Sequence, residues 1–190
     1  EGTELSSLEG RTLKQFRHRM QMIFQDPYAS LNPRMTVYDT LAEPLLLHGL
    51  VNKAGLDQAI RELMDNVGLA RAFVRKYPHE FSGGQRQRIA IGRALATRPE
   101  FIVADEPVSA LDVTIQAQIL DLLAELTKEY GLTMLFISHD LAVIRQIADR
   151  IAVMYHGKLV EEGSTAQVFE TPSEDYTRSL LAAIPGANAA

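Results

Sequence analysis

The feature that most constrains the fold is a strand–helix–strand pattern between residues 101 and 137. Phe101-Ile102-Val103-Ala104 is a continuous apolar run without alternation, which is typical of a strand covered on both faces by helices. Apolar residues at helical spacing follow, then Gly131 as a helix stop, and a second buried strand is expected at Thr133–Ile137. This order predicts a right-handed parallel crossover and therefore an α/β fold. The apolar helix positions are Ile115, Ile119, Leu122, Leu123, Leu126 and Tyr130.

The flanking segments predict further short elements. Residues 12–19 indicate a short basic helix, and Met20–Phe24 indicates a buried strand that ends at Gln25-Asp26-Pro27, so Gln25 lies at the carboxyl end of a strand. Helical spacing from residue 28 to about 98 predicts a helical subdomain. Beyond Ile137 we expect a helix through Ile147, a hairpin of 151–155 with 158–161 that turns at His156-Gly157, a helix capped by Ser164, and a last helix over 176–183.

Composition excludes several classes of protein. A formal charge of -5 and a pI near 5.5 argue against nucleic-acid binding, which needs Lys and Arg to neutralise phosphates. There is no cysteine, so disulfides and thiolate metal sites are excluded. No run approaches the ~20 apolar residues of a membrane-spanning helix. The start, Glu1-Gly2-Thr3, has neither Met nor the pattern of a signal peptide, and we interpret it as a cut point within a longer protein.

Two adjacent carboxylates follow the first strand of the central pattern. Asp105 and Glu106 stand at its carboxyl end, where ligands bind in open parallel sheets. One carboxylate there could hold Mg²⁺ while the other orients or deprotonates water, and Pro107 is expected to favour an extended backbone at Glu106. The alternative is that the acidic pair simply marks the end of the strand.

A glycine pair precedes another predicted helix. Ser82-Gly83-Gly84-Gln85 leads into residues 86–96, and paired glycines before a helix N-terminus can form an anion site. The alternative is an ordinary serine-capped helix. His139 follows the second strand of the central pattern, where an imidazole could donate to a phosphate or could be purely structural. The other histidines show no metal-ligand spacing.

These motifs occur in the order that is typical of the ATP-binding-cassette (ABC) family. The order is Gln25, Phe81 to Gln85, Phe101 to Glu106, Ser109-Ala110-Leu111-Asp112, and His139, which resemble the Q-loop, signature motif, Walker B strand, D-loop and H-loop. The resemblance implies an α/β fold: a P-loop NTPase-type parallel sheet core, truncated at its N-terminus, with an inserted helical subdomain. The implied parts are residues 1–27 of the core, a helical subdomain at 28–98, a RecA-like core at 99–163 and a C-terminal helical extension at 164–190.

The resemblance also implies the roles of individual residues, with ATP and Mg²⁺ as cofactors. Glu106, His139 and Gln25 would be catalytic, and Asp105 together with Gln25 would serve the metal. Ser82, Gly83, Gly84, Gln85 and Asp112 would bind nucleotide across a dimer of ATPase subunits. The Walker A loop G-x-x-x-x-G-K-[ST] does not occur in this sequence, so we expect the 190-residue chain alone to be inactive and its full-length parent to hydrolyse ATP.

The closest likeness is to the ATPase subunits of oligopeptide, dipeptide and nickel importers. It rests on residues 25–33 and on the tail at 175–181. It implies an ATP-binding subunit that couples hydrolysis to import of peptides or a similar solute. Its partners would be a second ATPase subunit, transmembrane permeases and, indirectly, a solute-binding protein, at the cytoplasmic face of the plasma membrane. The alternatives are a soluble, non-transport ABC ATPase, or a non-catalytic subunit that completes a partner's ATP site.

Overall fold

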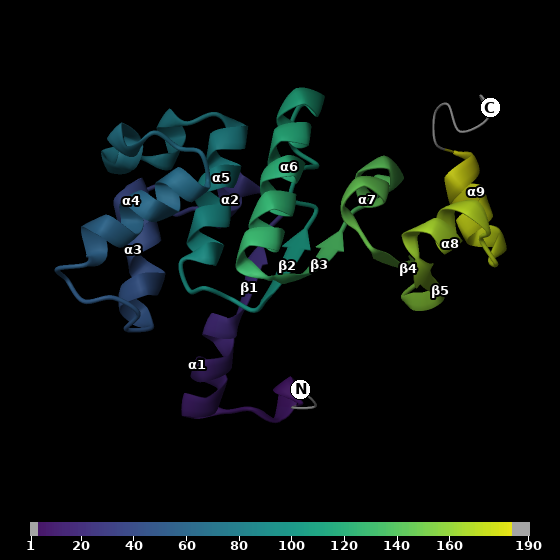
Figure 1. Cartoon of the computed structure of the whole chain (residues 1–190), viewed down its shortest axis with the longest axis horizontal. Helices are drawn as coiled ribbons and strands as arrows, with labels where there is room; N and C mark the ends of the chain where they lie inside the picture. Colours follow the sequence, from purple (N-terminus) through teal and green to yellow (C-terminus); the bar gives the residue numbers. More distant parts are fainter. Residues whose placement is uncertain (1–3, 184–190) are drawn as a thin grey trace. The chain divides into compact units, whose positions relative to one another are not determined.

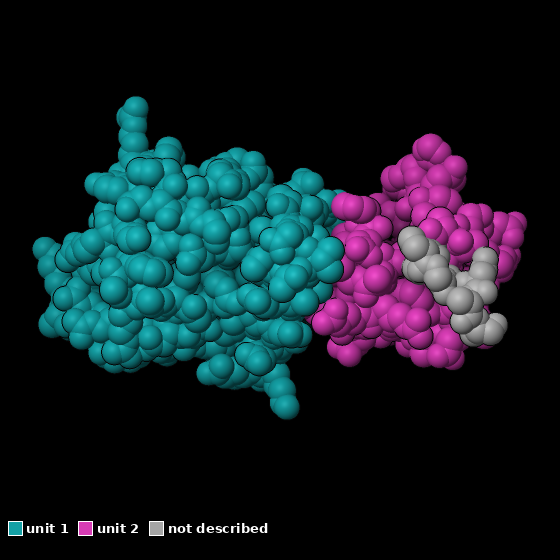
Figure 2. Space-filling model, turned by 90° about the horizontal axis from the view of Figure 1, so that it is seen from above, with its two compact units in different colours: residues 1–137 teal, residues 138–190 magenta. Residues whose placement is uncertain are grey.

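The computed structural model describes residues 4–183, and these fall into two compact units. The first unit comprises residues up to Ile137, and the second begins at Ser138 (Figure 2). Residues 1–3 of the predicted N-terminal part and residues 184–190 of the predicted C-terminal extension lie outside the described residues.

A three-stranded parallel sheet forms the centre of the first unit (Figure 1). Its order is β1 (Met20–Ile23), β2 (Phe101–Asp105) and β3 (Thr133–Ile137), with Ile23 level with Ala104 and Asp105 level with Ile137. The helix α6 (Val113–Tyr130) connects β2 to β3 and ends at Gly131, whose φ of 61° suits a glycine C-cap. The predicted parallel crossover is therefore confirmed.

Within the described residues of the first unit, only one face of this sheet is covered. The helices α5 (Gly83–Leu95) and α6 lie on that face (Figure 1). Ile102 and Ala104 of β2 are fully buried. The opposite face presents exposed apolar side chains, with Leu135 50% exposed and Ile137 43% exposed. The prediction that the Phe101–Ala104 strand is covered on both faces is thus wrong for this chain, because alternate residues meet a packed layer and an open one.

Short helices make up the segment between β1 and β2. Asp26 caps α2 (Pro27–Ser30), and Thr36 forms a capping box at the start of α3 (Val37–Leu47). The helix α4 (Leu56–Asn66) buries apolar side chains at helical spacing, including Ile60 and Met64. Turns of 3-10 helix at Arg71–Arg75 and Pro78–Glu80 lead into α5. Ahead of β1 lie a 3-10 turn (Leu5–Ser7) and α1 (Gly10–Arg19), which includes the predicted basic helix.

The second unit contains a helix, a hairpin and two further helices. The helix α7 (Leu141–Ile147) precedes the antiparallel pair β4 (Arg150–Tyr155) and β5 (Lys158–Ser164). The hairpin turns at His156 and Gly157, both with positive φ, as predicted. Ser164 caps α8 (Thr165–Glu170), and α9 (Asp175–Ala182) follows. Within the described residues, no helix is both long and apolar enough to cross a membrane.

Candidate functional site

The structure brings Gln25 and Glu106 into direct contact. Gln25 follows β1 and Glu106 follows β2, and these neighbouring parallel strands end at the same edge of the sheet. Gln25 Nε2 donates a hydrogen bond to Glu106 Oε2 at 2.9 Å. Two polar groups that are far apart in the sequence therefore meet at the edge where ligands bind in parallel sheets.

Glu106 has an unusual backbone conformation. Its φ is +44°, a left-handed value that costs a non-glycine residue roughly 1–3 kcal/mol. The prediction that Pro107 holds Glu106 extended is therefore wrong. Hydrogen bonds override the proline preference, because the Glu106 N–H donates to the Ile137 carbonyl and the Glu106 carbonyl accepts from the N–H and the hydroxyl of Ser109. Such strain persists where the surroundings fix the conformation, which is frequent at functional sites.

Asp105 is the last residue of β2 and is half-buried. Alternation along the strand directs its side chain to the open face of the sheet, together with Val103. No group of three or more His, Cys, Asp or Glu side chains that could hold a metal ion occurs within residues 4–183. One carboxylate still fits Mg²⁺, because protein sites usually hold this ion through one or two carboxylates and the phosphates of a nucleotide.

Ser82 begins the helix α5 through a capping box. Its hydroxyl accepts from the Gln85 N–H at 3.3 Å, and Gln85 Oε1 accepts from the Ser82 N–H at 3.1 Å. The serine-capped helix that we considered as an alternative is therefore present. An anion site at the same helix end stays a prediction, since a cap satisfies only some of the N-terminal amides.

Gly84 is required by packing, which the sequence alone did not reveal. A Cβ at this position would lie 2.4 Å from Ile115 Cγ2, and one at Gly83 would lie 3.2 Å from Leu111 Cδ2. Both contacts come from the segment around the start of α6, where Asp112 Oδ1 accepts from the Ile115 N–H at 3.1 Å. The N-terminal ends of α5 and α6 therefore lie side by side, and the predicted nucleotide-binding residue Asp112 is the N-cap of α6.

His139 belongs to the second unit, in the turn between β3 and α7. The next residue, Asp140, caps α7 by accepting from the N–H groups of Ala142 and Val143. The role of His139 stays a prediction. Among the other histidines, the rings of His18 and His48 lie 5.6 Å apart and the ring of His79 stacks on Tyr77.

Comparisons with known proteins agree with this geometry. Residues 1–109 match the ABC transporter family. The chain is 59% identical over 176 residues to the oligopeptide transport ATP-binding protein OppF of Bacillus subtilis, covering 92% of this chain and 58% of the relative. It is 50% identical to the glutathione import ATP-binding protein GsiA of Pectobacterium atrosepticum, covering 99% of this chain and 30% of the relative. The chain thus spans less than two thirds of either relative.

A solved structure shares the fold. It is a dimeric ATP-binding cassette in a post-hydrolysis state, bound to ADP and phosphate, with a TM-score of 0.72 and 31% identity over 84% of this chain and 68% of that chain. The parallel sheet with its flanking helices is accordingly a P-loop NTPase-type α/β core, as predicted. The family match covers more than half of the sequence. The chain belongs to the ABC transporter family.

Proposed function

We propose that this chain forms most of the ATP-binding subunit of an importer that couples ATP hydrolysis to the uptake of peptides or a similar small solute. The observation that carries the proposal is the hydrogen bond from Gln25 to Glu106, at the edge of the sheet where Asp105 also ends its strand. The solute class is taken from relatives whose names specify oligopeptide and glutathione import.

The predicted site residues would each have a separate role in ATP hydrolysis. When bound, ATP would supply the phosphoryl group, and Mg²⁺ would supply positive charge that offsets the negative phosphate oxygens. Asp105 would hold the metal through its carboxylate. Glu106 would polarise the attacking water, and Gln25, already hydrogen-bonded to Glu106, would fix the carboxylate and contact the metal and the water. His139 would donate a hydrogen bond to the terminal phosphate.

The N-terminal end of α5 would serve a second ATPase subunit. In a head-to-tail dimer, Ser82, Gly83, Gly84 and Gln85 would contact the terminal phosphate that the partner binds, with Asp112 beside them. Two observations support this proposal. The N-terminal ends of α5 and α6 adjoin, so the positive ends of both helix dipoles lie in one region. The similar solved cassette is dimeric.

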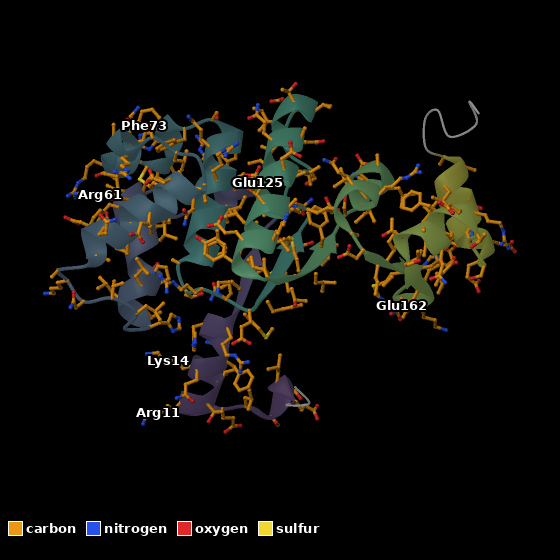
Figure 3. The ribbon with its side chains drawn as sticks, in the orientation of Figure 1. Arg11, Lys14, Arg61, Phe73, Glu125 and Glu162 are labelled. Atoms are coloured by element: carbon orange, nitrogen blue, oxygen red, sulfur yellow. The ribbon has the colours of Figure 1, made fainter. Side chains whose placement is uncertain are left out.

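The helical segment offers a surface for a permease. We propose that residues between Gln25 and Thr40 dock a cytoplasmic helix of the permease, at the cytoplasmic face of the plasma membrane. Tyr38 of this segment lines a small cavity of about 120 Å³ together with residues of α4 and of the turn at Arg71–Arg75. Figure 3 labels Arg61, which is one of the lining residues. The Tyr38 hydroxyl donates to Asp57 Oδ1 at 2.7 Å, and the Arg75 guanidinium lies over the Tyr38 ring. A solute-binding protein would act only through the permease.

The test is steady-state ATP hydrolysis by the full-length protein that contains this sequence. Glu106→Gln should lower kcat by at least about 100-fold, because positioned acid–base groups contribute roughly 10²–10⁴ in rate. Glu125→Gln is the matched control, since Glu125 is an exposed carboxylate on α6 (Figure 3). Equal turnover by both variants would refute the catalytic assignment.

A non-catalytic role is the second candidate. The observation behind it is the capped N-terminal end of α5, which is complete in this chain and could serve a partner's ATP site. If the full-length protein binds no ATP but raises hydrolysis by a partner ATPase, this second function replaces the first.

A further inference from the structure

The helix α5 holds the segment that follows Gln25 through two arginines. The Arg86 guanidinium lies over the Tyr28 ring, with 3.8 Å from Cζ to the ring centroid. Arg93 Nη1 donates to the Ser30 carbonyl at 2.6 Å. Arg86 and Arg93 are seven residues apart, about two helical turns, so both reach α2 from one side of α5.

Arg86 also holds the loop that leads into α5. Its side chain is buried, with the residue only 7% exposed, and its Nε donates to the Pro78 carbonyl at 2.5 Å. This one guanidinium therefore joins α2, the turn at Pro78–Glu80 and α5. Burying a charged group in this way is costly unless its polar atoms are paired, and Nη1 of Arg86 has no hydrogen-bond partner.

The segment between Gln25 and Tyr28 is itself constrained. Asp26 Oδ1 accepts from the Tyr28 N–H at 2.7 Å, and Pro27 fixes the first position of α2. A displacement of Gln25 would therefore move Tyr28 as well. Tyr28 contacts Arg86, and Arg86 lies one helical turn after Ser82.

We infer that Arg86 and Arg93 are positioning residues that couple Gln25 to the N-terminal end of α5. This inference rests on the proposed function. Gln25 would contact the nucleotide of one site, and Ser82–Gln85 would contact the nucleotide of the other, so the arginines transmit occupancy between the two sites of a dimer. Arg93 keeps its charge in this role. Burial lowers the pKa of Arg93, and the nearby carboxylate of Glu43 acts in the opposite direction.

The first test measures ATP hydrolysis by the full-length protein without its permease, so that a permease contact cannot contribute. Tyr28→Leu removes the aromatic ring, and Tyr28→Phe retains it. We expect Tyr28→Leu to lower kcat about fivefold, the change that a cation–π contact of about 1 kcal/mol gives, with KM nearly unchanged. The Hill coefficient for ATP should fall toward one. Tyr28→Phe should restore both values.

The matched control is Arg88→Ala. Arg88 is also on α5, and its Nη1 donates to the Val67 carbonyl at 2.8 Å, so this variant loses an arginine–carbonyl bond that does not involve α2. It should lower the melting temperature yet leave the Hill coefficient unchanged. If the wild type is active and Tyr28→Leu has an unchanged kcat and Hill coefficient, the coupling inference is overturned but the proposed function is not. An inactive wild type would overturn the proposed function.

The second test does not depend on turnover. Amide hydrogen exchange of the full-length protein should be faster over residues 82–86 in Tyr28→Leu than in the wild type, because the contact that holds the N-terminal turn of α5 is lost. Tyr28→Phe and Arg88→Ala should leave exchange of this segment near the wild-type rate. Equal exchange in Tyr28→Leu and the wild type would contradict the coupling even if the protein hydrolyses no ATP.

Discussion

Replacing Gly84 by alanine should destabilise the protein, although alanine is the better helix former. The added Cβ would lie 2.4 Å from Ile115 Cγ2, whereas ordinary contacts begin at 3.4 Å, so α5 and α6 must separate locally by about 1 Å. Overpacking of this kind costs roughly 1–3 kcal/mol. For a protein of this size, the melting temperature should fall by about 2–10 °C, with helix propensity offsetting part of the cost.

The assay is thermal unfolding of the full-length protein in a double-mutant cycle. In the Ile115→Ala background the nearest remaining atom of residue 115 is Cβ, at 3.7 Å, which is an ordinary contact. Gly84→Ala should then be neutral or should stabilise by up to about 1 kcal/mol. Gly83→Ala, whose Cβ meets Leu111 Cδ2 at 3.2 Å, is the milder control. If Gly84→Ala costs the same in both backgrounds, contact with Ile115 is not the reason for this glycine.

Three further predictions follow from the site and the fold. The 190-residue chain alone should show no steady-state ATP turnover, because positioning of the phosphates supplies most of the catalysis; turnover that Glu106→Gln abolishes would contradict this. The open apolar face of the sheet should make this isolated chain self-associate in light scattering, and Leu135→Lys should reduce the association, whereas an equally monomeric wild type would argue against it. Thr177 and then the Ser173 N–H lower the pKa of Glu161 to about 2. A lowered pKa stabilises the fold above the unfolded value of about 4.5, and the effect is lost as the pH falls through 2. Glu161→Gln should therefore lower the melting temperature at pH 7 and lower it progressively less as the pH falls below 4.5 toward 2; a pH-independent effect would contradict this.

The elements that the sequence predicted are those with local signals. The runs Met20–Phe24 and Phe101–Ala104 are strongly apolar and end at polar residues followed by proline, so the strands and their carboxyl ends were visible. Gly131 and Ser164 marked helix ends because a left-handed C-cap and an N-cap depend on single residues. The sequence placed Gln25 and Glu106 each at the carboxyl end of a strand, and the pairing of β1 with β2 brings them into contact.

Features set by contacts between distant segments could not be predicted. The left-handed Glu106 depends on its bond to the Ile137 carbonyl, which overrides the preference imposed by Pro107. The need for Gly84 depends on Ile115, which comes from a different helix. An apolar run such as Phe101–Ala104 also cannot show whether a second layer covers it, because its residues are apolar on the packed and on the open face alike. The seven-residue spacing of Arg86 and Arg93 could have indicated that both side chains lie on one face of α5.

The most direct test of the account is a crystal structure of the full-length Glu106→Gln variant with ATP and Mg²⁺. We predict that the metal contacts the carboxylate of Asp105, that the amide of Gln25 lies within hydrogen-bond distance of a metal ligand or of the attacking water, and that residue 106 faces the terminal phosphate. A nucleotide bound with its phosphates away from this edge of the sheet would contradict the account.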